Sequence, residues 1–187
     1  MVLWLVGATV AGLAVIGIGW YVGTYNTLVT AKQDMKTQWS NIKTEYQRRA
    51  DLILNLVATV KSFKKHERDT LVEVAKARGG QLGPTKAAEL KKMGFVDQML
   101  QRLMVVVEQY PNLKSNEQHN QLMEELRVTE DRINIARTDY NGTVRDYNLL
   151  VNRWPSSWVA KRKGFAEEMF FDLVTKGAEK APVVNLG

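Results

Sequence analysis

The sequence contains no cysteine among its 187 residues, which excludes disulfide bonds, thiolate metal sites and cysteine nucleophiles. It contains only four prolines, and none precedes Pro84. Because proline terminates helices, the first half of the chain is free to form one very long helix. The two histidines, His66 and His119, lie on separate predicted elements and form no metal-ligand pattern. We therefore expect no metal or other cofactor.

Other signatures of chemistry are also missing. The glycine-rich stretch Gly79–Gly83 precedes a proline and lacks the Lys-Ser/Thr pair of a phosphate-binding loop, so it is interpreted as a turn. Acidic pairs such as Glu124-Glu125 fall on long predicted helices, where charged runs are usually solvated faces. The sequence therefore predicts a protein that is not an enzyme and has no small-molecule substrate.

The net charge of +6 is unevenly distributed. Between Lys32 and Arg78 there are eleven Lys or Arg against six Asp or Glu, whereas from Pro111 to Pro155 the balance is six against seven. No basic segment alternates with aromatic residues as a base-stacking groove would require, so we expect no nucleic acid partner. The position of the excess favours a membrane surface instead.

A long uncharged run occupies the beginning of the sequence. Val2–Val22 contains no charged residue, and about 20 apolar residues suffice for a helix to cross the hydrocarbon core. A cleaved signal peptide would need a basic start, a shorter apolar stretch and a small-residue cleavage site, and the following Gly23-Thr24-Tyr25-Asn26 does not supply the last of these. We therefore expect one transmembrane helix over residues 2–22, with the lipid bilayer as a partner.

Charges beside the run predict its orientation. Lysines dominate the residues that follow it, with Asp34 as the one acid before Lys43. The positive-inside rule then places the N-terminus outside and the larger domain in the cytoplasm, at the inner membrane of the cell. The residues expected at the two membrane interfaces are Trp4, Trp20, Tyr21 and Lys32.

Small residues recur at a spacing of four within the run, and such faces let membrane helices approach closely. The residues expected to mediate helix association are Gly7, Gly12, Gly19 and Gly23. Two interpretations remain open: a homo-oligomer that packs through this face, or the ordinary frequency of glycine in membrane helices.

The soluble part shows heptad periodicity, which is typical of coiled coils. The first seam is Met35, Trp39, Ile42, Tyr46, Arg49, Ile53, Leu56, Val60 and Phe63, and nothing between Thr24 and Arg78 breaks a helix. A second helix is predicted from Thr85, a good N-cap, to Tyr110. A third opens at the capping box Ser115–Gln118 and closes before Pro155. Its seam is Leu122, Leu126, Thr129, Ile133, Ala136, Tyr140, Thr143, Tyr147 and Leu150.

These helices cannot bury their apolar stripes alone, so they should pack together. The predicted fold is all-α: a transmembrane helix, an elongated antiparallel bundle of very long helices over residues 24–175, and a C-terminal tail over 176–187. A last short helix is expected from Phe165 to Val174.

Arg49 places one charge in the first seam, where burial without a partner would be costly. We expect a polar core in which Arg49 pairs with a carboxylate on a neighbouring helix, either Glu130 or Glu108. The alternative is that its long side chain reaches solvent.

Several separated motifs, in order along the chain, resemble the LemA family of bacterial membrane proteins. They are Tyr46–Val57, Thr59–Lys61, His66-Glu67, Glu108–Lys114, Thr129–Ile133, Ala136-Arg137, Tyr140-Asn141, Val144, Tyr147-Asn148 and Pro155-Ser156, with Tyr25-Asn26 after the apolar run. The resemblance implies a membrane-anchored elongated helical bundle with a short outer N-terminus, and it implies no catalytic residue or cofactor. Leu54 departs from the family, which usually has proline there, so the usual kink is in doubt.

Two functions are compatible with these features. The first is a scaffold that presents helix faces to itself or to other membrane-associated proteins, with the Tyr-Asn pairs of the third helix among the candidate contact points. The second is a lipid-surface effector that remodels the bilayer with basic segments. Its candidate contacts are the cluster Lys61, Lys64, Lys65 and Arg68, and the C-terminal segment with Trp154, Trp158, Lys161, Arg162 and Lys163.

Overall fold

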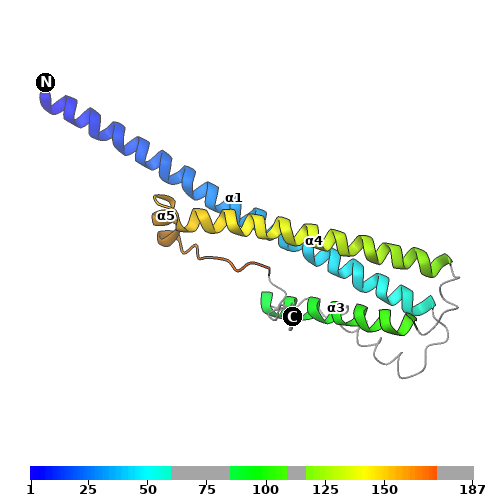
Figure 1. Cartoon of the computed structure of the whole chain (residues 1–187). Coiled ribbons are helices and arrows are strands. Elements are labelled where there is room, and N and C mark those ends of the chain that lie inside the picture. Colours follow the sequence, from blue (N-terminus) through cyan, green and yellow to red (C-terminus); the bar gives the residue numbers. More distant parts are fainter. Residues whose placement is uncertain (60–84, 109–116, 172–187) are drawn as a thin grey trace, which may run out of the picture. The chain divides into compact units, whose positions relative to one another are not determined.

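The computed structural model describes residues 1–59, 85–108 and 117–171. Within these ranges the chain forms four α-helices and no β-strand (Figure 1). They are α1 (Val2–Thr59), α3 (Lys86–Glu108), α4 (Glu117–Asn152) and α5 (Ser156–Lys163). The predicted all-α class is confirmed.

Helix α1 is continuous over 58 residues, because neither proline nor a charge cluster interrupts it. It passes through Leu54 without a break, so the departure from the family's usual proline leaves this helix whole. Its first 20 or so residues are exposed, and burial begins at Leu28. The buried positions then follow a heptad: Leu28, Met35, Trp39, Ile42, Tyr46, Arg49, Ile53 and Leu56. The predicted seam residues Val60 and Phe63 lie outside the described ranges.

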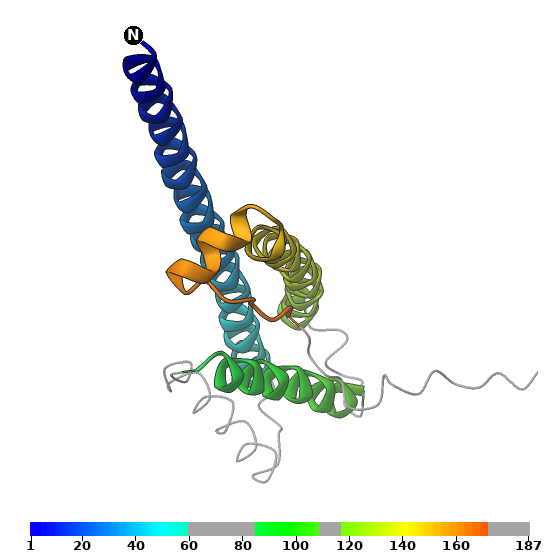
Figure 2. The same ribbon diagram turned by 90° about the vertical axis from the view of Figure 1, so that its left-hand side faces the viewer.

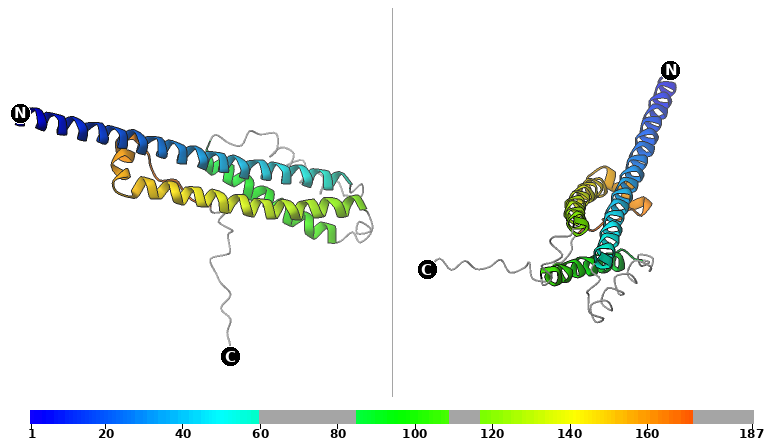
Figure 3. Two further views of the ribbon diagram at one scale, coloured as in Figure 1. Left: turned by 90° about the horizontal axis from the view of Figure 1, so that it is seen from above. Right: turned by 90° about the vertical axis from the view of Figure 1, so that its right-hand side faces the viewer.

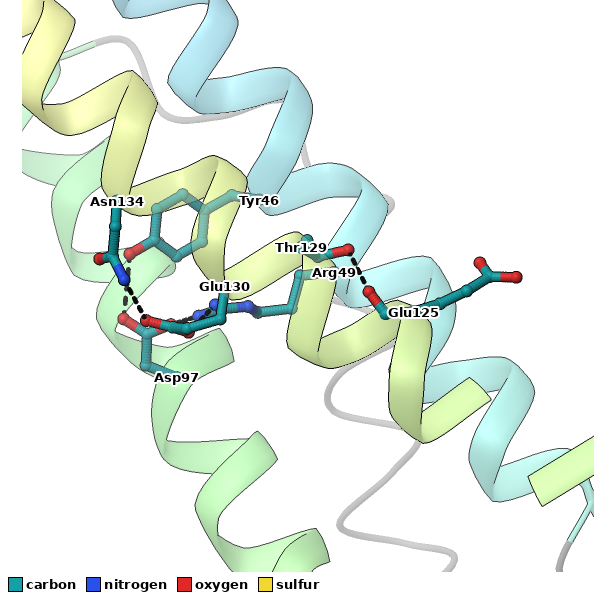
Figure 4. A network of polar contacts seen from close by, with 7 residues as sticks. All are labelled: Tyr46, Arg49, Asp97, Glu125, Thr129, Glu130 and Asn134. Carbon is teal, nitrogen blue, oxygen red and sulfur yellow. Dashed lines mark hydrogen bonds and ion pairs between the residues drawn. The ribbon is translucent and has the colours of Figure 1, made fainter. Parts of the chain in front are cut away.

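The chain divides into two compact units, and α1 and α4 each run through both of them. Of the described residues, unit 1 comprises 1–42 and 136–170, and unit 2 comprises 43–59, 85–108, 117–135 and Phe171. In unit 1 the end of α4 runs antiparallel to α1, and α5 turns back toward α1 (Figure 3). In unit 2 the green helix α3 packs beside the cyan end of α1 and the start of α4 (Figures 2 and 4).

The helix starts and seams follow local sequence rules. Thr85 caps α3, since the backbone N–H of Ala88 donates to its Oγ1 at 3.3 Å. The capping box predicted at Ser115 begins outside the described residues. In α4 the first predicted heptad position, Leu122, is only partly buried, and the positions from Leu126 to Tyr140 are buried. After Tyr140, Val144, Tyr147 and Val151 are buried, and Thr143 and Leu150 are only partly so. A straight helix has 3.6 residues per turn, so its inward face drifts away from a strict heptad.

The last helix was predicted in the wrong place. It spans Ser156–Lys163, whereas Phe165–Phe171 is not helical. The reason is Gly164, whose φ of 72° is left-handed and ends α5. The N–H groups of Gly164 and Phe165 donate back to Lys161 O and Ala160 O, which is the Schellman pattern of a helix C-terminus. The predicted tail, residues 176–187, lies outside the described part of the chain.

Candidate functional site

Unit 2 is held together by a polar cluster at its centre, drawn in Figure 4. The side chain of Arg49 on α1 is 2% exposed and pairs with Asp97 of α3 and Glu130 of α4. Tyr46 lies one turn earlier on α1 and donates its hydroxyl to the other oxygen of Asp97 at 3.0 Å. Asn134 donates to Glu130 Oε1 at 3.4 Å. One arginine therefore joins α1, α3 and α4, the three helices described in this unit.

The partners of Arg49 differ from those expected in one respect. Glu130 was one of the two candidates, but the other, Glu108, is exposed on α3. It lies eleven residues after Asp97, which is about 16 Å further along the helix axis. Asp97 takes its place, and sequence reasoning missed it. The feature that could have identified Asp97 in the sequence is its position as an acidic residue at the edge of the apolar stripe between Met93 and Leu100. The alternative that Arg49 reaches solvent is wrong.

The contacts of the cluster are those of a structural ion-pair network that links helices. The guanidinium is a poor group to bury alone, and its two carboxylates keep contact with water, because their side chains are 24% and 44% exposed. Arg49 also stacks over the ring of Tyr46, 5.5 Å from its centroid. A second ion pair between Lys43 and Glu89, at 3.5 Å, links α1 to α3 again.

In unit 1 the residues after α5 form a segment that we call the strap, residues 165–170. It lies along α4 and is held by the polar side chains of that helix. Tyr140 and Tyr147 donate their hydroxyls to Met169 O and Ala166 O at 3.1 and 3.0 Å. Asn148 accepts from the N–H of Glu168 and donates to its carbonyl, both at 2.9 Å. Asn152 donates to the Glu167 carboxylate at 2.6 Å.

This arrangement changes the interpretation of the Tyr-Asn pairs of α4. They were expected as contact points for other proteins, but Tyr140 and Tyr147 are fully buried and bind the chain's own strap. Burial raises the pKa of Tyr147, and the charge of Glu168 adds to the effect. The hydroxyl therefore stays protonated and keeps donating at neutral pH.

The strap and α5 meet α1 in a set of ring contacts that we call the collar: Tyr21, Tyr25 and Lys32 of α1, with Trp158, Arg162, Lys163 and Phe165. The rings of Tyr21 and Trp158 are 6.0 Å apart between centroids, and those of Tyr25 and Phe165 are 6.1 Å apart. Three cations lie over rings: Lys32 over Phe165, Lys163 over Tyr25 and Arg162 over Trp158, at 5.5, 5.3 and 5.8 Å.

The collar brings together residues that the sequence placed in separate groups. Tyr21 and Lys32 were expected at a membrane interface, and Trp158 and Lys163 were expected to contact lipid. The contacts show that α5 returns to α1 at the end of the uncharged run. Trp154, in the turn before α5, is 81% exposed, and on α5 itself Trp158 is 55% exposed and Lys161 is exposed.

Before the collar, α1 is exposed, with no neighbour among the residues that the structure describes. Its first part is long and apolar enough to cross a bilayer, and none of that segment is buried. Trp4 is 87% exposed and Trp20 is 41% exposed. A Cβ atom added at any of the four small positions would have nothing within 4 Å; these are Gly7, Gly12, Gly19 and Gly23. Exposed apolar surface of this extent marks a site of membrane or protein contact.

Within residues 1–59, 85–108 and 117–171, no three His, Asp or Glu side chains are grouped so as to hold a metal ion. His119 is 3% exposed, and its burial lowers its pKa.

Comparison with known proteins identifies the family of this chain. Residues 38–186 match the model of the LemA family. The chain is 31% identical to magnetosome protein MamQ 2 of Paramagnetospirillum magneticum, in an alignment covering 86% of this chain and 68% of that protein. It is 29% identical to magnetosome protein MamQ of Magnetospirillum gryphiswaldense, with the same coverage. It is 25% identical to Protein LemA of Metamycoplasma hominis over 76% of this chain and 66% of that protein. The chain therefore belongs to the LemA family.

Proposed function

We propose that this LemA-family protein is a membrane-anchored helical scaffold. Residues 2–22 cross the inner membrane, the N-terminus lies outside, and the helical domain stands in the cytoplasm, where it associates with copies of itself and with other membrane-associated proteins. The observation that carries the proposal is the continuity of α1, which joins an exposed apolar segment to a buried heptad seam in one helix.

The dimensions of the segment fit a bilayer. Its 21 residues rise about 30 Å as a helix, which matches the hydrocarbon thickness of a membrane. The large side chains on all its faces are exposed, including Val10 at 61% and Ile16 at 69%. In water this surface would promote aggregation, whereas in lipid it is satisfied without any protein neighbour.

The surrounding charges support the orientation. Lys32, Lys36 and Lys43 follow the segment, and basic residues close to a span favour the cytoplasmic side. Because α1 has no break between Val22 and Leu28, the span and the first bundle helix are one element. The crossing angle of the span therefore sets the direction of the helix that carries the bundle.

Membrane extraction tests the anchor. Replacing Val10 and Ile16 by Lys places two charges at the centre of the span, each disfavouring insertion by about 3 kcal/mol. We expect this variant to leave the membrane fraction in alkaline carbonate, whereas the unmodified protein stays. The matched control, Val105→Lys with Ile135→Lys, changes two side chains that are equally exposed outside the span. The anchor is wrong if the unmodified protein is extracted like a peripheral protein.

Self-association is tested by disulfide crosslinking, for which a chain without cysteine is well suited. Ala8 lies on the small-residue face with Gly12, whereas Val10 lies on the opposite face, because two residues turn a helix by about 200°. Oxidation in native membranes should crosslink the Ala8→Cys protein into dimers and leave Val10→Cys largely monomeric. Monomers from both variants would remove self-association through this face from the proposal.

A further inference from the structure

We propose that the collar and the exposed residues of α5, Trp158 and Lys161–Lys163, bind the phosphate groups of anionic lipid headgroups, so that α5 lies on the surface of the cytoplasmic leaflet. The inference rests on the proposed span, because the span fixes where the membrane surface lies. It deepens that function by naming the lipid class that the domain contacts.

The first step is the level at which α5 meets α1. Trp158 contacts Tyr21 and Phe165 contacts Tyr25, and both tyrosines lie within about one turn of the end of the apolar run at Val22. If residues 2–22 fill the hydrocarbon core, these contacts lie in the headgroup layer. Tryptophan and tyrosine are enriched at that level in membrane proteins.

The second step is the charge of the segment. Residues 153–166 contain Arg153, Lys161, Arg162 and Lys163 and no Asp or Glu. In the part of the chain that the structure describes, none of these four side chains forms an ion pair with a carboxylate. Their positive charge is therefore available to an external anion, and basic residues at this level attract anionic lipids.

The third step is the two-sided character of α5. Val159 and Ala160 are fully buried, whereas Trp158 and the three cations of the last turn are exposed, as is Trp154 in the turn before the helix. Exposed tryptophan beside a basic cluster is the composition of a helix that lies in a membrane interface. The cations of Arg162 and Lys163 are also positioned over rings, which orders them before they meet a phosphate.

The test uses tryptophan fluorescence of the full chain in lipid nanodiscs that contain brominated phosphatidylcholine, with or without phosphatidylglycerol. Three sets of Trp→Phe substitutions leave different reporters: Trp154 with Trp158, Trp20 alone, or Trp39 alone. Trp39 is buried against Tyr140 and lies 17 residues beyond Val22, about 25 Å along α1, so it reports the background.

With phosphatidylglycerol, we expect bromine to quench Trp154 and Trp158 at least about twofold more strongly than Trp39, with a return toward the Trp39 level at high salt. Lys161→Gln with Arg162→Gln and Lys163→Gln should abolish the difference. Lys161→Arg with Lys163→Arg should retain it, as should the control Lys91→Gln with Arg102→Gln and Arg132→Gln, which removes three exposed cations from other helices.

Quenching of Trp20 combined with background quenching of Trp154 and Trp158 would contradict the contact of α5 with the headgroups and would leave the proposed span intact. Equal quenching with and without phosphatidylglycerol would overturn the role of the lipid charge. Background quenching of Trp20 would overturn the span, and with it the inference that depends on it.

Discussion

Arg49 of α1 and Asp97 of α3 form an ion pair inside unit 2, in a seam whose neighbouring positions are apolar. The pair ties α3 to α1, and the same guanidinium continues to Glu130 of α4. A charge in a hydrophobic seam stabilises only the arrangement that supplies its partners, because every other arrangement leaves it unpaired. The pair thus specifies how the three helices align.

The first prediction concerns this pair. Asp97→Asn should lower the free energy of unfolding by about 2 kcal/mol, because it leaves the buried guanidinium with one carboxylate. Glu130→Gln should cost less, since its side chain is 44% exposed and water screens its charge. Denaturant unfolding of the full chain in detergent, followed by circular dichroism, measures both.

The control for this experiment is Asp139→Asn, which removes an exposed carboxylate of α4 and should change stability by less than about 0.5 kcal/mol. In an Arg49→Met background, Asp97→Asn should lose most of its effect. An equal cost in both backgrounds would mean that the two side chains are not coupled.

The second prediction concerns the strap. Asn148→Ala removes both hydrogen bonds to Glu168, so the Glu168 amide should exchange with solvent about fivefold faster, corresponding to about 1 kcal/mol. Asn152→Ala is the matched control, because it loses one bond to the exposed Glu167 side chain and should leave that exchange rate nearly unchanged. The same acceleration in both variants would contradict the assignment of the strap contact to Asn148.

The third prediction contrasts two glycines, neither of which has an atom within 4 Å of an added Cβ. Gly164→Ala should destabilise by about 1 kcal/mol, because φ is +72° there, and Gly164→Asn should cost less. Gly142→Ala, in the middle of α4, should instead stabilise by about 0.5–1 kcal/mol. Thermal unfolding reads the sign of each change, and a stabilising Gly164→Ala would contradict the left-handed end of α5.

The fourth prediction concerns His119, whose pKa is lowered by burial. In the unfolded chain it binds a proton near pH 6.5, whereas the folded chain binds it only at lower pH. The unfolded state therefore holds more protons in that interval, and stability falls as the pH drops below about 6.5 toward the folded pKa. His119→Gln should remove this part of the pH dependence. An unchanged pH profile in His119→Gln would exclude the effect.

The sequence was sufficient wherever a local pattern determines the outcome. The exposed apolar helix that is a candidate span follows from an uncharged run, and the seam from Met35 to Leu56 follows from spacing alone, because both depend on residues within a few turns of one helix. The pairing of Arg49 was predictable in kind, since a buried charge needs a partner. The identity of Asp97 was not, because it depends on how α3 is aligned against α1.

The end of the chain shows the same limit. Phe165–Phe171 has an apolar composition that favours a helix, but side chains of α4 satisfy its backbone groups instead. The aromatic and basic residues near Trp158 were visible in the sequence as a candidate surface. Their contacts with Tyr21 and Tyr25 required the return of the antiparallel helix, which joins residues more than 130 positions apart.

The central claim is that α1 is both the membrane anchor and the first helix of the bundle. Single cysteines, one inserted directly after Met1 and the others replacing Leu13 and Asn41, labelled with a membrane-impermeant maleimide in right-side-out and inverted vesicles, test it most directly. The account predicts that the cysteine after Met1 reacts only from the outer side, Leu13→Cys from neither side, and Asn41→Cys only from the cytoplasmic side. Labelling of Leu13→Cys as readily as Asn41→Cys, or labelling of Asn41→Cys from the outer side, would contradict it.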